Sequence, residues 1–255
     1  MFARFSKHLF LFQELVKRDF KQKYKGTVIG MAWSVLSPLL TLLVMRLVFT
    51  QFFGRDTPHY TTYLFAGNLF FNFFKEATKG GMTALVSNAS IFTKINVPKY
   101  LFLLSKNVSA VINFGLTLII FFLFAAIDNI TFGWHFLMLI YPILYLVIFN
   151  IGVGLILSAM YIFFRDTRYL YDVFTLLLHY CSAIFYYVDR YPANLQWIFL
   201  VNPVYLPIKY VRVIVLESNI PSIQYHLLML AWAAVVVGIG ALIYKKCNHK
   251  FLYYV

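Results

Sequence analysis

The clearest chemical pattern lies between positions 163 and 187, where a charged turn precedes a mostly apolar run. Within that run Asp172, Thr175, His179, Ser182 and Tyr186 follow one another at spacings of 3, 4, 3 and 4. These spacings place all five side chains on one face of a helix. Polar groups are costly in hydrocarbon unless they find partners, so this face must meet protein or water. The pattern predicts that the helix lines a hydrophilic path.

The sequence shows no arrangement of residues that would support catalysis or metal binding. The sequence contains no Gly-x-x-x-x-Gly-Lys-[Ser/Thr] phosphate loop, so this chain is not expected to bind ATP in the P-loop manner. His179 has no Glu or Cys nearby at metal-ligand spacing, and a hydrogen-bonded packing role is slightly favoured for it over ligand contact. None of the nine Asp and Glu residues forms a pair within a span, whereas a proton-coupled carrier needs carboxylates there. We therefore expect no catalytic residue, no metal and no cofactor in this chain.

The composition is that of a membrane protein with several spans. Of the 255 residues 62% are hydrophobic and 12% are charged, whereas soluble domains are roughly 45–50% apolar and about 25% charged. The mean hydropathy is +0.76. A net charge of +13 would indicate nucleic acid binding in a soluble protein, but here the positive-inside rule explains it better. We expect no nucleic acid partner.

The expected fold is all-α and integral to the membrane, with residues 1–255 forming one transmembrane domain. Residues 1–30 are predicted to form a cytoplasmic amphipathic helix lying in the lipid headgroup layer. Six spans are predicted at 31–53, 60–79, 107–127, 136–164, 171–187 and 226–244. Between the last two, the apolar segments 195–201 and 204–216 are too short or too interrupted to cross, and we interpret them as re-entrant or interfacial helices.

The distribution of Lys and Arg orients these spans. With six spans both termini lie on one side, and the segments on that side carry 17 of the 22 Lys and Arg residues. The opposite segments carry four, and Arg46 lies within the first span. The positive-inside rule therefore predicts that both termini are cytoplasmic.

Three further helices carry polar or small residues along one face. Ser34, Ser37 and Thr41 share a face of the first span, and Asn68 and Asn72 begin a face of the second that continues through Lys75 and Lys79. On the fourth span Asn150, Gly154 and Ser158 recur every fourth residue, which close helix packing explains better than ligand binding.

Three stretches of sequence, in the same order along the chain, carry a family resemblance. They are Lys17-Arg18-Asp19-Phe20-Lys21-Gln22-Lys23-Tyr24-Lys25-Gly26, continued by Gly30-Met31-Ala32-Trp33-Ser34 and Pro38-Leu39; Phe163-Phe164-Arg165-Asp166-Thr167-Arg168; and Asn202-Pro203. With these stretches the whole chain resembles the permease subunits of ABC-2-type polysaccharide exporters. Those exporters move lipid-linked O-antigen, capsule or teichoic acid.

The resemblance implies a homodimer of this subunit in the bacterial inner membrane, joined to two copies of a separate ATPase that binds ATP and Mg. It also implies that the cytoplasmic segment between spans two and three couples to the ATPase, and that spans one, two and five enclose the conduit. The expected coupling residues are Asn88, Ser90, Ile91, Phe92 and Lys94.

The cargo would then be a glycan on a polyprenyl diphosphate. Lys21, Lys25, Arg165 and Arg168 are the basic residues expected to capture its anionic headgroup, although the same charges also serve topology. The expected channel residues are Trp33, Ser34, Ser37, Thr41, Asn68, Asn72, Thr175, His179, Tyr180, Ser182, Phe185 and Tyr186. Aromatic rings suit sugars, but membrane interfaces attract Tyr and Trp regardless of function. The alternatives are a drug or small-lipid exporter of the same architecture, and an enzyme acting on polyprenyl-linked sugars.

Overall fold

The computed structural model describes residues 2–53, 58–95 and 97–254, and these residues form helices and connections without a β-strand. The long helices are α1 (Phe2–Tyr24), α2 (Trp33–Phe53), α3 (Tyr60–Ser87), α5 (Tyr100–Ile127), α6 (Ile140–Phe163), α7 (Thr167–Cys181) and α10 (Ile223–Cys247). Shorter helices are η1 (Gly30–Ala32), α4 (Ala89–Phe92), η2 (Trp134–Leu139), η3 (Val188–Arg190), α8 (Ala193–Val201), α9 (Tyr205–Leu216) and η4 (Lys250–Leu252).

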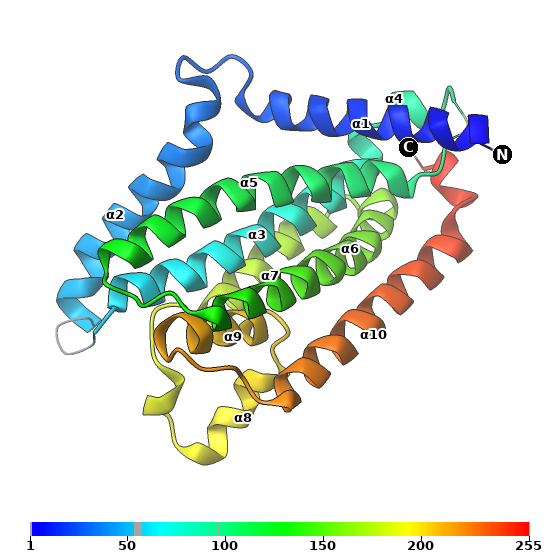
Figure 1. Cartoon of the computed structure of the whole chain (residues 1–255). Helices are drawn as coiled ribbons and strands as arrows, with labels where there is room; N and C mark the ends of the chain where they lie inside the picture. The colour runs from blue at the N-terminus through cyan, green and yellow to red at the C-terminus, as the bar shows by residue number, and fades with distance from the viewer. Residues whose placement is uncertain (1, 54–57, 96, 255) are drawn as a thin grey trace.

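Helix α3 forms the centre of the bundle. It packs along α5 and α6, and α10 packs along the other side of α6 (Figure 1). Side chains of α3 from Thr62 to Phe71 are buried without interruption, so this stretch of helix meets protein on every side. A continuous apolar run of this kind has the composition of a core helix. We call α3, α5, α6 and α10 the scaffold.

Small residues allow the scaffold helices to approach closely. A Cβ atom on Gly81 of α3 would lie 3.0 Å from the Cα atom of Gly154 on α6. A Cβ atom on Gly152 would lie 2.8 Å from the backbone nitrogen of Val237 on α10. Ser158, at 0% exposure, is within hydrogen-bond distance of the Tyr244 hydroxyl, at 2.9 Å. The predicted packing role of the small-residue face on the fourth span is therefore confirmed.

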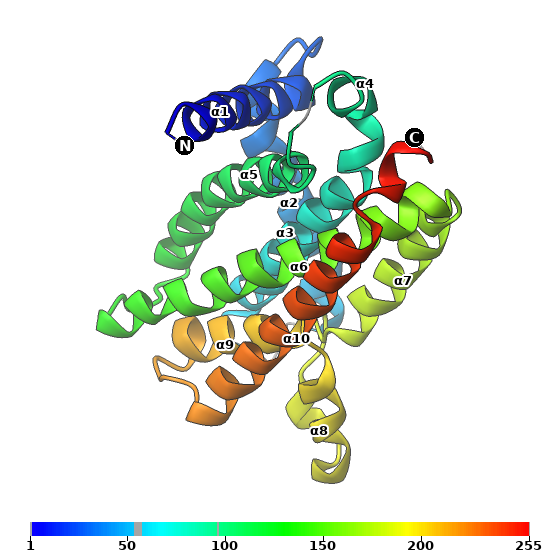
Figure 2. The same ribbon diagram turned by 90° about the vertical axis from the view of Figure 1, so that its right-hand side faces the viewer.

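The molecule has two distinct ends. Helix α1, helix α4 and the C-terminus gather at one end, and α8 and α9 lie at the other (Figures 1 and 2). The turn from α1 into α2 contains Gly26 at φ 83° and Gly30 at φ 59°. Glycine adopts this left-handed backbone without a Cβ clash, so the chain changes direction there. We call the end with both termini the inner end and the other the outer end.

The amphipathic helix predicted at residues 1–30 appears as α1. Its residues Leu11 and Leu15 pack on a cluster that also contains Phe92, Phe102 and Phe251. Leu9, two positions before Leu11 and therefore on another side of the helix, is 49% exposed. Part of the apolar surface of α1 is therefore covered by protein at the inner end.

By length and composition, three helices of the described chain can cross a membrane: Tyr100–Ile127, Trp134–Phe163 and Ile223–Cys247. The pair α8 and α9, which bends by 110°, would count as a fourth if its two halves form one span. The chain is thus a multi-pass membrane protein. Helices α2, α3 and α7 do not meet this measure, so the six-span topology stays a prediction.

The fifth predicted span, 171–187, is wrong in its extent. Helix α7 begins at Thr167 and ends at Cys181, and its 15 residues fall short of the roughly 17–25 that a crossing requires. The chain turns at Ala183, whose φ is 49°. Arg212 of α9 donates hydrogen bonds to the freed carbonyl oxygens of Ala183 (2.8 Å) and Ile184 (3.0 Å). A tertiary contact therefore fixes the end of this helix.

Candidate functional site

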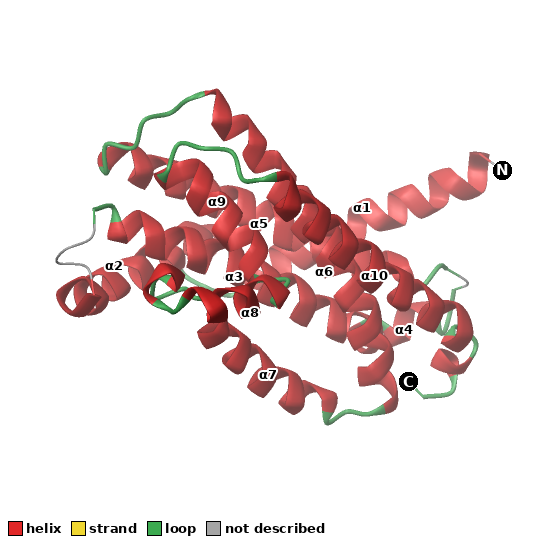
Figure 3. Cartoon of the chain, turned by 90° about the horizontal axis from the view of Figure 1, so that it is seen from below, coloured by secondary structure: helices red, strands yellow, loops and turns green. Residues whose placement is uncertain are grey.

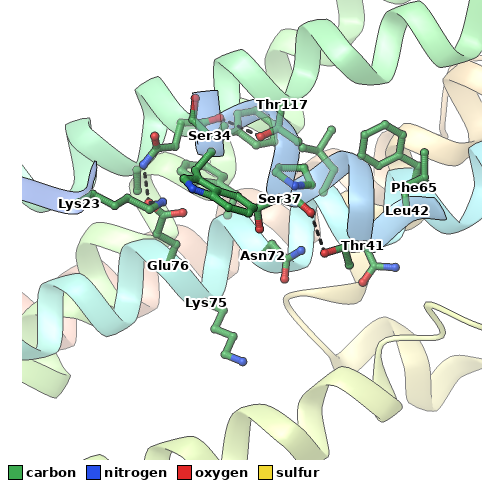
Figure 4. Close-up of a pocket in the computed structure, with 18 of the residues that line it drawn as sticks. Lys23, Ser34, Ser37, Thr41, Leu42, Phe65, Asn72, Lys75, Glu76 and Thr117 are labelled. Atoms are coloured by element: carbon green, nitrogen blue, oxygen red, sulfur yellow. Dashed lines mark hydrogen bonds and ion pairs between the residues drawn. The ribbon is translucent and has the colours of Figure 1, made fainter. Parts of the chain in front are cut away.

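A cavity of about 750 Å³ opens between α2, α3, α5 and the end of α1. Six of the predicted channel residues line it, and they come from the two polar faces of the first two spans (Figure 4). These residues are Trp33, Ser34, Ser37, Thr41, Asn68 and Asn72. The polar faces of α2 and α3 therefore lie opposite one another across this space, and their role as a substrate channel stays a prediction. We call this space the main cavity.

The main cavity changes in character along its length. Lys23, Lys75, Glu76 and Lys79 line it toward the inner end. Toward the outer end its walls are Leu42, Met45, Phe65 and Leu69, with Asn68 among them. A cavity that is cationic at one end and apolar at the other fits an amphipathic anion better than a neutral hydrocarbon.

Glu76 organises the charged end of the main cavity. Its Oε1 atom accepts hydrogen bonds from Lys23 Nζ of α1 at 2.8 Å and from Asn113 Nδ2 of α5 at 2.7 Å (Figure 4). One carboxylate thus ties α1, α3 and α5 together beside the cavity. Figure 4 shows Lys75 extending from α3 on the side of α7, where it is exposed.

Hydroxyl and amide side chains line the main cavity from α2 and α3. Thr41 Oγ1 donates to the backbone oxygen of Ser37 at 2.9 Å, which turns that hydroxyl back along its own helix. Asn68 Nδ2 contacts Met45 Sδ at 3.0 Å and donates to the Leu64 oxygen at 3.2 Å. Asn72 is exposed and lines the same space. The cavity therefore offers hydroxyl and amide groups to a ligand or to water.

The channel residues predicted on the fifth span do not line the main cavity. Thr175 is buried and donates to the backbone oxygens of Tyr171 and Asp172, at 2.9 and 3.0 Å. Ser182 lies beyond the end of α7 and accepts a hydrogen bond from Asn202 Nδ2 at 3.1 Å. The single helical face drawn through Asp172, Thr175, His179, Ser182 and Tyr186 is therefore wrong for its last two members, because the helix stops at Cys181.

The aromatic residues around the end of α7 pack on one another. The His179 ring stacks on Phe71 of α3 with ring centroids 4.5 Å apart, and Phe185 lies 5.2 Å from it. Among the described residues His179 Nε2 is buried without a hydrogen-bond partner. The Tyr186 hydroxyl donates to the Tyr180 oxygen at 2.8 Å, while Tyr180 itself is exposed. His179 thus packs within an aromatic group.

The four predicted headgroup residues are exposed at the inner end but outside the lining of the main cavity. They are Lys21, Lys25, Arg165 and Arg168. The Arg165 guanidinium lies 5.3 Å from the Tyr161 ring centroid. In their place, Lys23, Lys75 and Lys79 supply the cations that line the cavity, and Lys79 Nζ is 2.7 Å from Asp172 Oδ1 of α7.

The predicted coupling segment forms the short helix α4 and the turns beside it. Ser90 and Lys94 are exposed and Ile91 is half-buried. Asn88 and Phe92 point inward: Asn88 has 0% exposure, and Phe92 packs 6.0 Å from Phe102 between ring centroids. The exposed side of the segment is therefore available to a partner, while Asn88 and Phe92 hold it in place.

An ion-pair network at the inner end joins α1 to this segment. The Asp19 side chain is 1% exposed and accepts from Arg18 at 2.8 Å and from Lys106 of α5 at 2.9 Å. Its second oxygen accepts from Ser105 at 2.9 Å. Arg18 also donates to Asn88 Oδ1 at 2.7 Å. The network therefore ties the predicted coupling segment and α5 to α1, which leads into α2.

The C-terminal tail supports the same end. Phe251 has 0% exposure and lies between Phe163 and Tyr244, at centroid distances of 5.9 and 5.2 Å. Lys99, directly before α5, donates to the Asn248 backbone oxygen. Partial burial lowers the pKa of Lys99 below its usual value. The turn after α4 is therefore anchored to the end of α10.

Several residues of the site were not singled out from the sequence. Lys23, Glu76, Asn113 and Thr117 line the main cavity although the predicted set omits them. Glu76 is the one carboxylate of α3, and that is the signal in the sequence that marks it. Within the described ranges no three His, Cys, Asp or Glu side chains form a cluster able to hold a metal ion.

Comparison with known proteins agrees with this architecture. The family model described as ABC-2 type transporter matches residues 10–216. Two proteins of Klebsiella pneumoniae, each named O-antigen export system permease protein RfbA, are 26% and 27% identical over 251 and 249 residues, covering 95% of this chain and 95% of each relative. A protein of the same name from Myxococcus xanthus is 23% identical over 241 residues, covering 93% of this chain and 92% of the relative.

Proposed function

Because the chain belongs to the ABC-2 type transporter family, we propose that it is the transmembrane subunit of an exporter that moves polyprenyl-diphosphate-linked polysaccharide out of the cytoplasm. Relatives over nearly the whole chain carry the name O-antigen export system permease. The observation that carries the proposal is the main cavity, with its cationic inner end and apolar outer end. The chain is a permease and not an enzyme.

The chemistry of this cargo matches the cavity. A diphosphate is strongly anionic, and Lys23, Lys75 and Lys79 offer three ammonium groups near the end from which the cargo enters. Glu76 keeps Lys23 in place and limits the net positive charge. A site with some charge compensation holds an anion without trapping it, and release is as necessary to transport as capture. Hydroxyl and amide groups further along then meet the sugars.

The energy for transport comes from a separate ATPase, which binds ATP and Mg. Two copies of it join a homodimer of this chain, and the exposed residues Ser90 and Lys94 contact it together with the half-buried Ile91. ATP binding in the ATPase displaces the coupling segment, and the network of Arg18, Asp19 and Asn88 passes that displacement to α1. Helix α2 follows α1 in the chain, so one wall of the main cavity moves.

The proposed topology has six spans and cytoplasmic termini in the bacterial inner membrane. The basic residues of the inner end support this orientation through the positive-inside rule. Helices α2 and α3, and α7 together with the connection that follows it, would complete the crossing, and in the assembled dimer a second copy covers surface that is exposed in a single chain. O-antigen is the glycan that the relatives' names favour over capsule or teichoic acid.

Reconstitution provides the test. The chain is incorporated into proteoliposomes together with its ATPase and a polyprenyl-diphosphate-linked glycan, and a membrane-impermeant lectin detects glycan that reaches the trans side. We expect lectin binding to require ATP. Lectin binding without ATP, or ATP-driven movement of a lipophilic dye with no movement of glycan, would contradict the proposal; the second result would identify a drug or small-lipid exporter.

A further inference from the structure

A second cavity, of about 210 Å³, lies near the outer end of the described chain. Its walls come from the start of α3, the connection after α7, and α9. The residues that line it include Tyr63, Tyr187, Asp189, Tyr205, Lys209 and Glu217. Tyr63 lies roughly 18 Å along α3 from Lys75, at a rise of about 1.5 Å per residue. This outer cavity shares no lining residue with the main cavity.

The floor of the outer cavity is a fully occupied arginine. Arg212 is 3% exposed and its guanidinium carbon lies 3.4 Å from the Tyr63 ring centroid. It makes four hydrogen bonds to the backbone oxygens of Tyr63, Ala183 and Ile184, at 2.8–3.3 Å. A guanidinium has five N–H donors, so little capacity remains for a ligand. Arg212 thus shapes the cavity and does not serve as an anion site.

Counted together with Arg212, the charged side chains that line the outer cavity balance. Lys209 is the other cation, and its Nζ atom lies 3.5 Å from Glu217 Oε1. Asp189, which is exposed, adds a second carboxylate. Among the described lining residues a phosphate would meet two carboxylates and, apart from the occupied Arg212, one lysine, so it would be repelled as much as attracted. An apolar ligand would strip water from these charges without replacing it. A neutral ligand with many hydroxyl groups meets neither penalty.

The aromatic walls point to the same ligand. Tyr63 and Tyr187 stack with ring centroids 4.1 Å apart, and Tyr60 lies 6.1 Å from Tyr63. Aromatic faces provide large, rigid contact area at low conformational cost, and they suit the C–H surfaces of a sugar ring. The cavity has about the volume of seven water molecules at 30 Å³ each, which is space for one sugar ring and not for a chain.

We propose that the outer cavity is a subsite for one neutral sugar residue, in which Asp189, Glu217 and Lys209 bind hydroxyl groups and Tyr187 contacts the ring. This inference rests on the proposed function, since it assigns the outer cavity to the glycan as it leaves. The subsite holds the leading part of the glycan after it has passed the bundle. Each sugar unit released there would hinder backward sliding of the chain.

Binding of simple sugars tests the subsite directly. The full chain with its ATPase is placed in lipid nanodiscs, because sugar-based detergents would compete, and a panel of methyl glycosides of neutral hexoses is examined by saturation-transfer difference NMR. We expect signals from at least one glycoside with the wild-type complex. Asp189→Asn and Tyr187→Leu should each reduce these signals at least fivefold. Asp166→Asn, which changes an exposed carboxylate at the inner end, should leave them unchanged.

Three results would overturn the subsite: no glycoside signal with the wild-type complex, equal signals with all variants, or saturable binding of inorganic phosphate at the same residues. The outcome is separable from that of the export assay. Glycoside binding without ATP-driven glycan movement would remove the proposed function and leave the subsite. Normal glycan movement with no glycoside binding would remove only the subsite.

Discussion

The scaffold and the two outlying helices α2 and α7 are held by different interactions. Backbones in the scaffold approach until a single added Cβ would collide, as at Gly81 and Gly154. Helix α7 lies at the edge of the bundle (Figure 3). Polar side chains tie it to α3, Tyr171 to Thr78 and Asp172 to Lys79. Helix α2 faces the main cavity along much of its length.

This difference assigns separate roles to the two regions. Close packing of small residues gives a unique and stiff arrangement, since it cannot be shifted without losing many contacts at once. A few polar ties can be exchanged at small cost, because water or a cargo replaces them. We therefore predict that the scaffold is the fixed frame and that α2 and α7 are the parts that move when cargo passes.

The largest expected effect on the free energy of unfolding comes from a substitution in the scaffold. Gly152→Leu introduces a side chain where even a Cβ meets the backbone of Val237 at 2.8 Å. We expect the free energy of unfolding to fall by about 3 kcal/mol, which is the upper part of the usual range for overpacking. Gly115→Leu, on α5, is the control because nothing lies within 4 Å of its added Cβ. Both variants are heated as purified proteins, and size-exclusion chromatography then measures how much folded protein remains. If the two variants lose stability equally, the close approach of the scaffold helices at Gly152 does not stabilise the scaffold.

The second largest effect on stability is expected at the buried contacts between α1 and the scaffold. Asp19→Asn removes a buried charge that accepts from Arg18, Ser105 and Lys106. We expect a loss of about 1–3 kcal/mol, the range for buried groups that lose a partner. In Glu14→Gln the affected pair is exposed, and the loss should stay below about 1 kcal/mol. The same heating series applies. If Glu14→Gln costs as much as Asp19→Asn, the buried network does not fasten α1.

The smallest effect is expected for the tie between α3 and α7. Lys79 and Asp172 are 39% and 42% exposed, so solvent screens their attraction. A double-mutant cycle with Lys79→Gln and Asp172→Asn should give a coupling of about 0.2–1 kcal/mol in stability. A coupling of several kcal/mol would instead place α7 in the frame. Because the tie is weak, each single variant should unfold close to the wild-type temperature.

The sequence predicted best where one helix carries its own signal. The polar faces of α2 and α3 follow from spacing alone, and so does the small-residue face of α6 around Gly154. The two short helices between α7 and α10 were also expected, from interrupted apolar segments at 195–201 and 204–216. In each case the pattern of one segment of sequence was sufficient for the prediction.

Prediction failed where a distant residue decides the local structure. The apolar run after Cys181 is compatible with a continuing helix, but Arg212 binds its carbonyl oxygens and the chain turns at Ala183. Likewise Glu76 of α3 and Asn113 of α5 form a hydrogen bond although they are 37 positions apart in the sequence. Neither contact has a local pattern, so both required the arrangement of helices in space.

Occlusion of the main cavity tests the central claim most directly. Ser37→Trp places an indole within the cavity, and Leu43→Trp places one on α2 at a side chain that is 52% exposed and lies outside the cavity. Both variants are reconstituted with the ATPase, and ATP-driven appearance of glycan is followed with the membrane-impermeant lectin. The account predicts at least a tenfold slower rate for Ser37→Trp and a rate near that of wild type for Leu43→Trp. Wild-type transport by Ser37→Trp in correctly assembled complexes would contradict it.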